Sequence, residues 1–175
     1  MKYLLVSVIL LSLVACKKVD KLTQFNMKYD EVVSIPSSTG VDLPFNILSP
    51  DITTNSESTF ASEDTRKDLI EQIILTNLEL SVVSPSSEDF SFLKSISVFI
   101  SAEGLPETKI AYQENIPDNA GSTLSLTTTN ADLKEYIKQD FYSLRVNATT
   151  DEFLAEEHRI NVHSVFFVDA KLLGQ

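Results

Sequence analysis

The chain has 175 residues, with 14 basic and 25 acidic side chains and a formal net charge of −11. The length suits one domain, and so acidic a chain without a basic stripe is not expected to bind nucleic acid. Cys16 is the only cysteine. The chain therefore forms no disulfide with itself, and core packing must hold the fold together.

The first feature along the chain is a secretory signal. Lys2 precedes an apolar run over residues 4–14, and small residues follow in the tetrapeptide Leu13-Val14-Ala15-Cys16. As a helix, the run from Tyr3 to Ala15 would span only about 20 Å at ~1.5 Å per residue, short of a hydrocarbon core of ~30 Å. It is therefore a poor permanent transmembrane anchor.

This tetrapeptide resembles the lipobox of bacterial lipoproteins. The resemblance implies cleavage before Cys16 and acylation of its thiol and new amino group, which would anchor the chain in membrane lipid permanently. Lys17 stands where some Gram-negative lipoproteins carry an aspartate that retains them in the inner membrane, so the outer membrane is expected. The resemblance divides the chain into a signal peptide (1–15), a lipidated cysteine with a short tether (16–23) and one domain (24–175). A plain secretory signal with a chance cysteine is the alternative.

The domain has a dominant period of two, which is typical of β-strands. Residues 25–35 and 41–47 alternate in this way, and turn-forming residues 36–40 between them predict a hairpin with a bulge at Val32. Pro44 is expected on an edge, because proline cannot donate to a central ladder.

Later strands are predicted by the same alternation. On the strand over 74–82, Ile74 and Thr76 are expected to share a face with Leu78. The final strand is apolar on both faces near Val165 and Phe167, which is typical of a central or covered strand. The predicted strands are residues 74–82, 96–100, 110–112, 124–126, 142–148 and 160–168, and the tyrosines expected in the core are Tyr29, Tyr112, Tyr136 and Tyr142.

Two short helices are expected between the strands. Thr129 with Asp132 resembles a capping box for a helix that ends near Asp140. Ser62 is expected to cap a second helix that runs to Ile70, while residues 53–59 are predicted to form a Ser/Thr-rich loop. The fold class expected is all-β, or β-rich with two short helices: an antiparallel β-sandwich, immunoglobulin-like or jelly-roll-like.

Motifs for chemistry are scarce. The few glycines are too scattered for a phosphate-binding loop or a dinucleotide fingerprint. His158 and His163 are the only histidines, and their spacing places them on opposite faces of one strand. A cation at Glu156-Glu157-His158 or at Asp118-Asn119 is a minor alternative to polar loops. We expect no catalytic, cofactor or metal residues, and Asn147-Ala148-Thr149 is read as part of a strand and not as a glycosylation site.

The function expected is that of a membrane-anchored, non-catalytic lipoprotein of the cell envelope. The leading hypothesis is a protein-interaction or structural module with an envelope protein as partner, bound by edge-strand addition. The alternative is a surface glycan-binding or adhesive module. An extracytoplasmic hydrolase comes third, and it would need a cleft that holds His158 or His163 against an acid and a hydroxyl.

Overall fold

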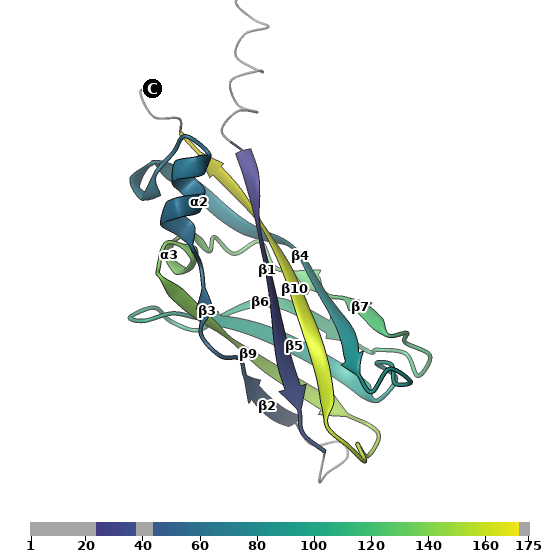
Figure 1. Cartoon of the computed structure of the whole chain (residues 1–175). Coiled ribbons are helices and arrows are strands. Elements are labelled where there is room, and N and C mark those ends of the chain that lie inside the picture. Colours follow the sequence, from purple (N-terminus) through teal and green to yellow (C-terminus); the bar gives the residue numbers. More distant parts are fainter. Residues whose placement is uncertain (1–23, 38–43, 172–175) are drawn as a thin grey trace, which may run out of the picture.

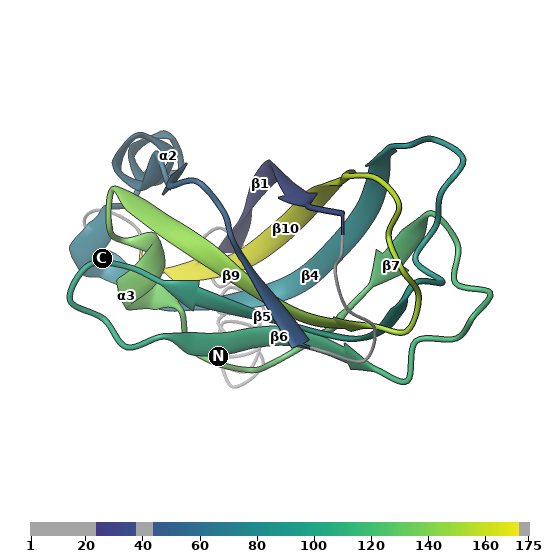
Figure 2. The ribbon, with the colours of Figure 1, turned by 90° about the horizontal axis from the view of Figure 1, so that it is seen from below.

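The predicted antiparallel sandwich is confirmed by a computed structural model, which describes residues 24–37 and 44–171. Two sheets form two layers (Figure 2), and each strand pair among the described residues is antiparallel. The lipobox and the tether lie outside the described residues. The lipid anchor therefore stays a prediction.

The first sheet consists of four strands: β1 (Gln24–Ile35), β4 (Ile70–Ser84), β7 (Thr123–Ser125) and β10 (His158–Ala170). Their order in space is β1-β10-β4-β7, so β10 is a central strand, as its apolar residues on both faces predict (Figure 1). The inner residues Phe166 and Val168 are fully buried, whereas Val165 and Phe167 are half-buried on the outer face.

The second sheet follows the order β2-β9-β5-β6-β8, and β3 also pairs with β9. Its inner side chains pack against those of the first sheet and form one apolar core. The strands are β2 (Pro44–Leu48), β3 (Ile52–Thr53), β5 (Leu93–Ser101), β6 (Thr108–Glu114), β8 (Thr127–Thr128) and β9 (Phe141–Thr150).

The predicted hairpin of residues 25–35 and 41–47 is wrong. Within the described part of the chain, β1 pairs with β10 alone, and β2 pairs with β9 in the other sheet. Alternation identifies a strand but not its partner, and here both partners come from the C-terminal end of the chain. The register of β1 runs without a shift, so the bulge predicted at Val32 is also wrong. Pro44 does open an edge strand, as expected.

A bulge in β4 changes which side chains face the core. The register of β4 against β10 shifts in the middle of the strand. Leu75 is buried before this bulge and Leu78 after it, so the alternation moves by one residue. Ile74 and Thr76, which were expected to share the face of Leu78, lie on the outer face instead.

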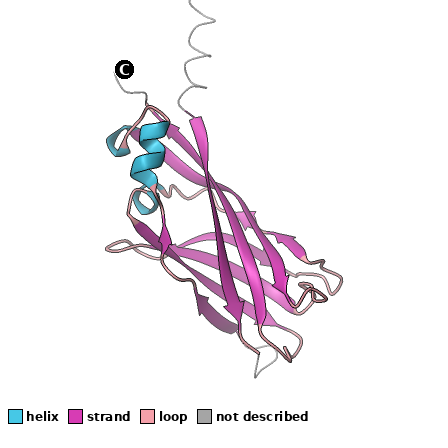
Figure 3. Cartoon of the chain, viewed as in Figure 1, coloured by secondary structure: helices cyan, strands magenta, loops and turns pink. Residues whose placement is uncertain are grey.

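The helices gather at the end of the sandwich where β1 begins (Figure 3). They are α2 (Ser56–Ser62), the 3-10 turn η2 (Lys67–Leu69) and α3 (Lys134–Ile137). The helix predicted from Ser62 to Ile70 is wrong, because Ser62 ends α2 and Ile70 opens β4. Phe60 of α2 is fully buried, and its ring centroid lies 6.1 Å from that of Phe25. Tertiary packing therefore stabilises a short helix in a segment that was expected to be a loop.

The other predicted helix, over 129–140, is present in a shorter form as α3. The Asp132 carboxylate accepts hydrogen bonds from the backbone N–H of Lys134 at 3.0 Å and of Ile73 at 3.2 Å. Leu133 is the N-cap residue of α3 and makes no side-chain capping bond, so the predicted capping box of Thr129 and Asp132 is not formed. The hydroxyl of Thr129 instead donates to the carbonyl of Lys109 at 3.0 Å. Tyr136 is buried, as predicted. No helix in the described ranges is long and apolar enough to cross a membrane.

Candidate functional site

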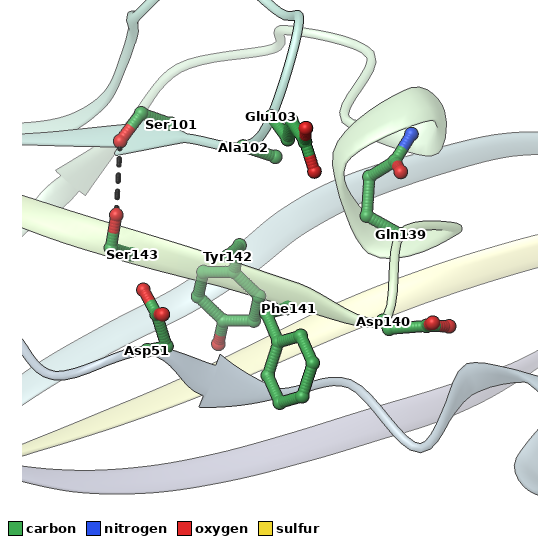
Figure 4. Close-up of a pocket in the computed structure, with 9 residues that line it drawn as sticks. All are labelled: Asp51, Ser101, Ala102, Glu103, Gln139, Asp140, Phe141, Tyr142 and Ser143. Atoms are coloured by element: carbon green, nitrogen blue, oxygen red, sulfur yellow. Dashed lines mark hydrogen bonds between the residues drawn. The ribbon is translucent and has the colours of Figure 1, made fainter.

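A pocket of about 450 Å³ opens where β5 ends and β9 begins. Figure 4 shows its lining, which comes from three separate parts of the chain. Asp51 precedes β3, a second group begins at the last residue of β5, and a third spans the turn from α3 into β9. The lining residues are Asp51, Ser101, Ala102, Glu103, Gln139, Asp140, Phe141, Tyr142 and Ser143.

Backbone and hydroxyl hydrogen bonds hold the first and third of these parts together. The Thr54 hydroxyl donates to the carbonyl of Gln139 at 2.6 Å, and the Thr54 N–H donates to the carbonyl of Asp140 at 3.0 Å. Thr53 is the register partner of Phe141 across the β3–β9 pair. The segment after β3 is thereby fixed against the start of β9, which sets the shape of the pocket.

Phe141 is the exposed aromatic residue of this site. The period of β9 points Tyr142 into the core and leaves Phe141 outside, with 53% of its surface exposed. Figure 4 shows the ring projecting away from the β9 ribbon at the edge of the pocket. An aromatic ring in this position offers a flat apolar surface to a ligand. Burial of that surface against the ligand would stabilise the complex.

A pair of hydroxyl groups lines the same pocket as this ring. Ser101 of β5 and Ser143 of β9 are register partners, and their hydroxyl oxygens are 3.1 Å apart. Each hydroxyl can donate one hydrogen bond and accept others, so the pair keeps hydrogen-bonding capacity for a ligand. The amide of Gln139 lies in the same wall.

The charge of the pocket is negative. Asp51, Glu103 and Asp140 line it, and no lysine or arginine does. The nearest ion pair joins Asp140 to Lys67 at 3.6 Å, and the Asp140 side chain is 83% exposed there. Such a lining accepts hydrogen bonds from neutral or cationic groups and repels anions.

His158 lies far from this pocket in a buried setting. Its Nδ1 is 3.0 Å from the carbonyl of Glu156, which can only accept, so Nδ1 carries the proton. The ring packs against Phe92 at a centroid distance of 4.9 Å, and 2% of the residue is exposed. The Glu157 carboxylate accepts a hydrogen bond from Ser34 at 3.2 Å. The cation site considered at residues 156–158 is therefore not assembled.

His163 lies on the outer face of the first sheet, on the opposite face of β10 from His158, as predicted. Its Nδ1 is 2.9 Å from a carboxylate oxygen of Asp30, and the amide of Asn161 donates to the same oxygen at 3.1 Å. Hydrogen bonds from Asn161 and His163 hold the pKa of Asp30 below its usual value. Among the described residues, which include Asp118 and Asn119, no group of three or more His, Cys, Asp or Glu could hold a metal ion.

The placement of Tyr112 in the core is wrong. A register shift between β5 and β6 turns Ile110 inward, so Tyr112 pairs with Ser97 on the outer face. The Lys109 ammonium lies 5.8 Å from the centroid of the Tyr112 ring. Tyr29, Tyr136 and Tyr142 do belong to the core or pack on it, as expected.

Asn147 is part of β9, as the sequence predicts, and it belongs to a polar network on this outer face. Its amide donates to the side chain of Asn46 at 3.1 Å. Arg145 donates to the same Asn46 oxygen at 2.6 Å, and to both oxygens of Glu107 at 2.6 Å each. Its guanidinium lies 4.2 Å from the centroid of the Phe99 ring. Most of the hydrogen-bonding groups of this network are paired with one another. The hydroxyls of the pocket differ, because they keep hydrogen-bonding capacity for a ligand.

No protein-family model matches this chain, and no curated protein does. Among solved structures, the chain is similar to a capsid protein of Helicobacter pylori bacteriophage KHP30, with 10% identity, 82% of this chain and 92% of that chain covered, and a TM-score of 0.35. The xylan-binding module CBM15 is 12% identical over 85% of this chain and 99% of its own, with a TM-score of 0.35. CBM32-3 of a family 31 glycoside hydrolase from Clostridium perfringens is 10% identical over 87% and 94%, with a TM-score of 0.33. At these identities and TM-scores, none of them lends its function to this chain.

Phe141 was not among the residues singled out from the sequence. The strand prediction over 142–148 nevertheless contains the signal, because a period of two that points Tyr142 inward must point Phe141 outward. A large aromatic side chain on the polar face of a strand is the feature that distinguishes this residue.

Proposed function

We propose that this chain is a lipid-anchored, non-catalytic binding module of the bacterial cell envelope whose ligand is a neutral glycan. The observation that supports a glycan most directly is the exposed ring of Phe141 in the same pocket as the hydroxyl pair of Ser101 and Ser143. A sugar ring has an apolar C–H face and a rim of hydroxyls, so it needs an aromatic platform with hydrogen-bonding groups next to it.

The acidic side chains of the pocket indicate which class of glycan would bind. Carboxylates such as Asp51 and Glu103 accept strong hydrogen bonds from sugar hydroxyls. A uronic acid or a sulfated sugar would bring a like charge to the same place. The lining therefore favours a glycan without negative charge.

The anchor is proposed from the lipobox at residues 13–16. Metabolic labelling with radioactive palmitate tests it directly. The label should appear on the wild-type chain and disappear in Cys16→Ala. An unlabelled wild-type chain that is released into the medium would instead support a plain secretory signal.

The glycan site is tested with the mature lipidated protein in detergent micelles, on a glycan array and then by titration calorimetry with any saccharide that binds. We expect Phe141→Ala to weaken binding at least tenfold, or about 1.4 kcal/mol. Phe153→Ala is the matched control, because Phe153 is also an exposed phenylalanine, at 65%, but lies outside this pocket. Equal losses in both variants, or no binding to any glycan, would contradict the proposal.

A second candidate, an envelope protein bound by strand addition, is favoured by one observation. β1 is an edge strand of 12 residues, and within residues 24–37 and 44–171 only β10 pairs with it. Its other edge offers backbone N–H and C=O groups to a strand from a partner. Cross-linked co-purification from native membranes tests this candidate, with Cys16→Ala for comparison. Recovery of one specific protein with the anchored form alone would support it, and recovery of none would contradict it.

A further inference from the structure

A second cavity adjoins the pocket on the other side of Phe141. It measures about 560 Å³ and is lined by residues 53–58 and Ala61, together with Asp140 and Phe141. The last two residues also line the first pocket, so the two cavities meet at the Phe141 ring. Each cavity has the volume of a small-ligand site.

The second cavity is more apolar than the first, but it also has polar side chains in its wall. Asn55, Glu57 and Ser58 are exposed polar residues in its wall, and no lysine or arginine lines it. The Asn55 side chain makes no capping bond to α2, so its amide remains available to a ligand. The exposed ring therefore has polar, uncharged or acidic groups on both sides.

We infer that the two cavities form one extended site for a linear neutral oligosaccharide, with a central sugar on the Phe141 ring and its neighbours in the two cavities. This inference rests on the proposed glycan function. A monosaccharide would fill only part of such a site. Each further sugar that enters a cavity adds hydrogen bonds and buried surface without a second loss of translational freedom.

The length of the ligand gives the test. Calorimetry on the lipidated protein in micelles would use neutral gluco-, xylo-, manno- and N-acetylglucosamine oligomers, from monosaccharide to hexasaccharide. We expect affinity in the series that binds to rise by about tenfold or more from the monosaccharide and then to level off once both cavities are filled.

Two variants of α2 distinguish the contribution of the second cavity to binding from that of the first. Ala61→Leu adds bulk inside the second cavity, and Ser62→Leu adds similar bulk one residue later, outside both cavities. Ala61→Leu should remove the gain that the second cavity contributes, so that affinity levels off at a shorter oligomer than in the wild type, while Ser62→Leu should leave the wild-type dependence on length unchanged. Affinity that is independent of length in the wild type, or an Ala61→Leu variant whose affinity levels off at the same length as the wild type, would overturn the extended site and leave the glycan function intact. Failure of every saccharide to bind the wild-type chain would overturn both.

Discussion

The hydroxyl of Tyr29 donates a hydrogen bond to the carbonyl of Thr54 at 2.7 Å. Tyr29 lies on β1 of the first sheet, and Thr54 follows β3 of the second, so this bond joins the two layers at their edge. Thr54 in turn bonds to the backbone of Gln139 and Asp140 in the wall of the pocket. Thr54 therefore links the edge of the sandwich to the wall of the pocket.

We expect Tyr29→Phe to lower the free energy of unfolding by about 1 kcal/mol, because a part-buried carbonyl loses its donor. Chemical denaturation with urea measures this change. Tyr112→Phe is the matched control, since it removes a tyrosine hydroxyl from the outer face and should change stability by less than about 0.5 kcal/mol. Equal stability of both variants with the wild type would show that the Tyr29 bond contributes nothing.

Alkaline pH should unfold the protein through two of its tyrosines. Burial raises the pKa of Tyr29 and of Tyr142 above the ordinary value of 10.0. A raised pKa in the folded state means that this contribution to stability is complete below about pH 10 and is lost as pH rises toward the folded value. Phenolate absorbance from these two residues should therefore appear together with the loss of tertiary structure. A phenolate signal that precedes unfolding would contradict this.

The positions of the strands along the chain were predicted better than the pairing between strands. Alternation identified the segments of β1, β5, β9 and β10 because each has one face in the core. The hairpin was wrong because proximity in the chain does not decide which edge a strand joins. Bulges at two places, beside Thr76 and Ile110, moved the alternation by one residue. Such shifts depend on contacts with the neighbouring strand. These contacts cannot be predicted from the sequence of one strand alone.

The site was harder to predict because its parts are brought together only by the fold. Asp51, Glu103 and Asp140 come from three loops, and nothing in their local sequence relates them. α2, which forms a wall of the second cavity, was missed because its Ser/Thr-rich sequence is typical of a loop and its stability comes from the burial of Phe60. Of the features of this site, the outward position of Phe141 is the one that the alternation of β9 could have predicted.

The pair of Glu107 and Arg145 should respond to acid. Hydrogen bonds from Arg145 hold the pKa of Glu107 below its ordinary value of 4.5. A depressed pKa means that the contribution to stability is present above about pH 4.5 and is lost as pH falls through the folded value. In Arg145→Gln the pKa of Glu107, followed by NMR, should rise toward 4.5. An unchanged pKa in this variant would show that the bidentate contact does not persist in solution.

The acidic lining should make the pocket select against charged sugars. Two unit charges about 4 Å apart in water repel by about 1 kcal/mol, which is roughly a fivefold change in affinity for each contact. Oligomers of galacturonic acid should therefore bind more weakly than neutral oligomers of equal length, and the difference should shrink as salt screens the repulsion. The double variant Asp51→Asn and Glu103→Gln should improve binding of the acidic oligomer, most of all at low salt. The neutral oligomer should show little dependence on salt in either protein, because no ion pair forms. Tighter binding of the acidic oligomer by the wild-type chain would mean that cationic groups outside the pocket control recognition.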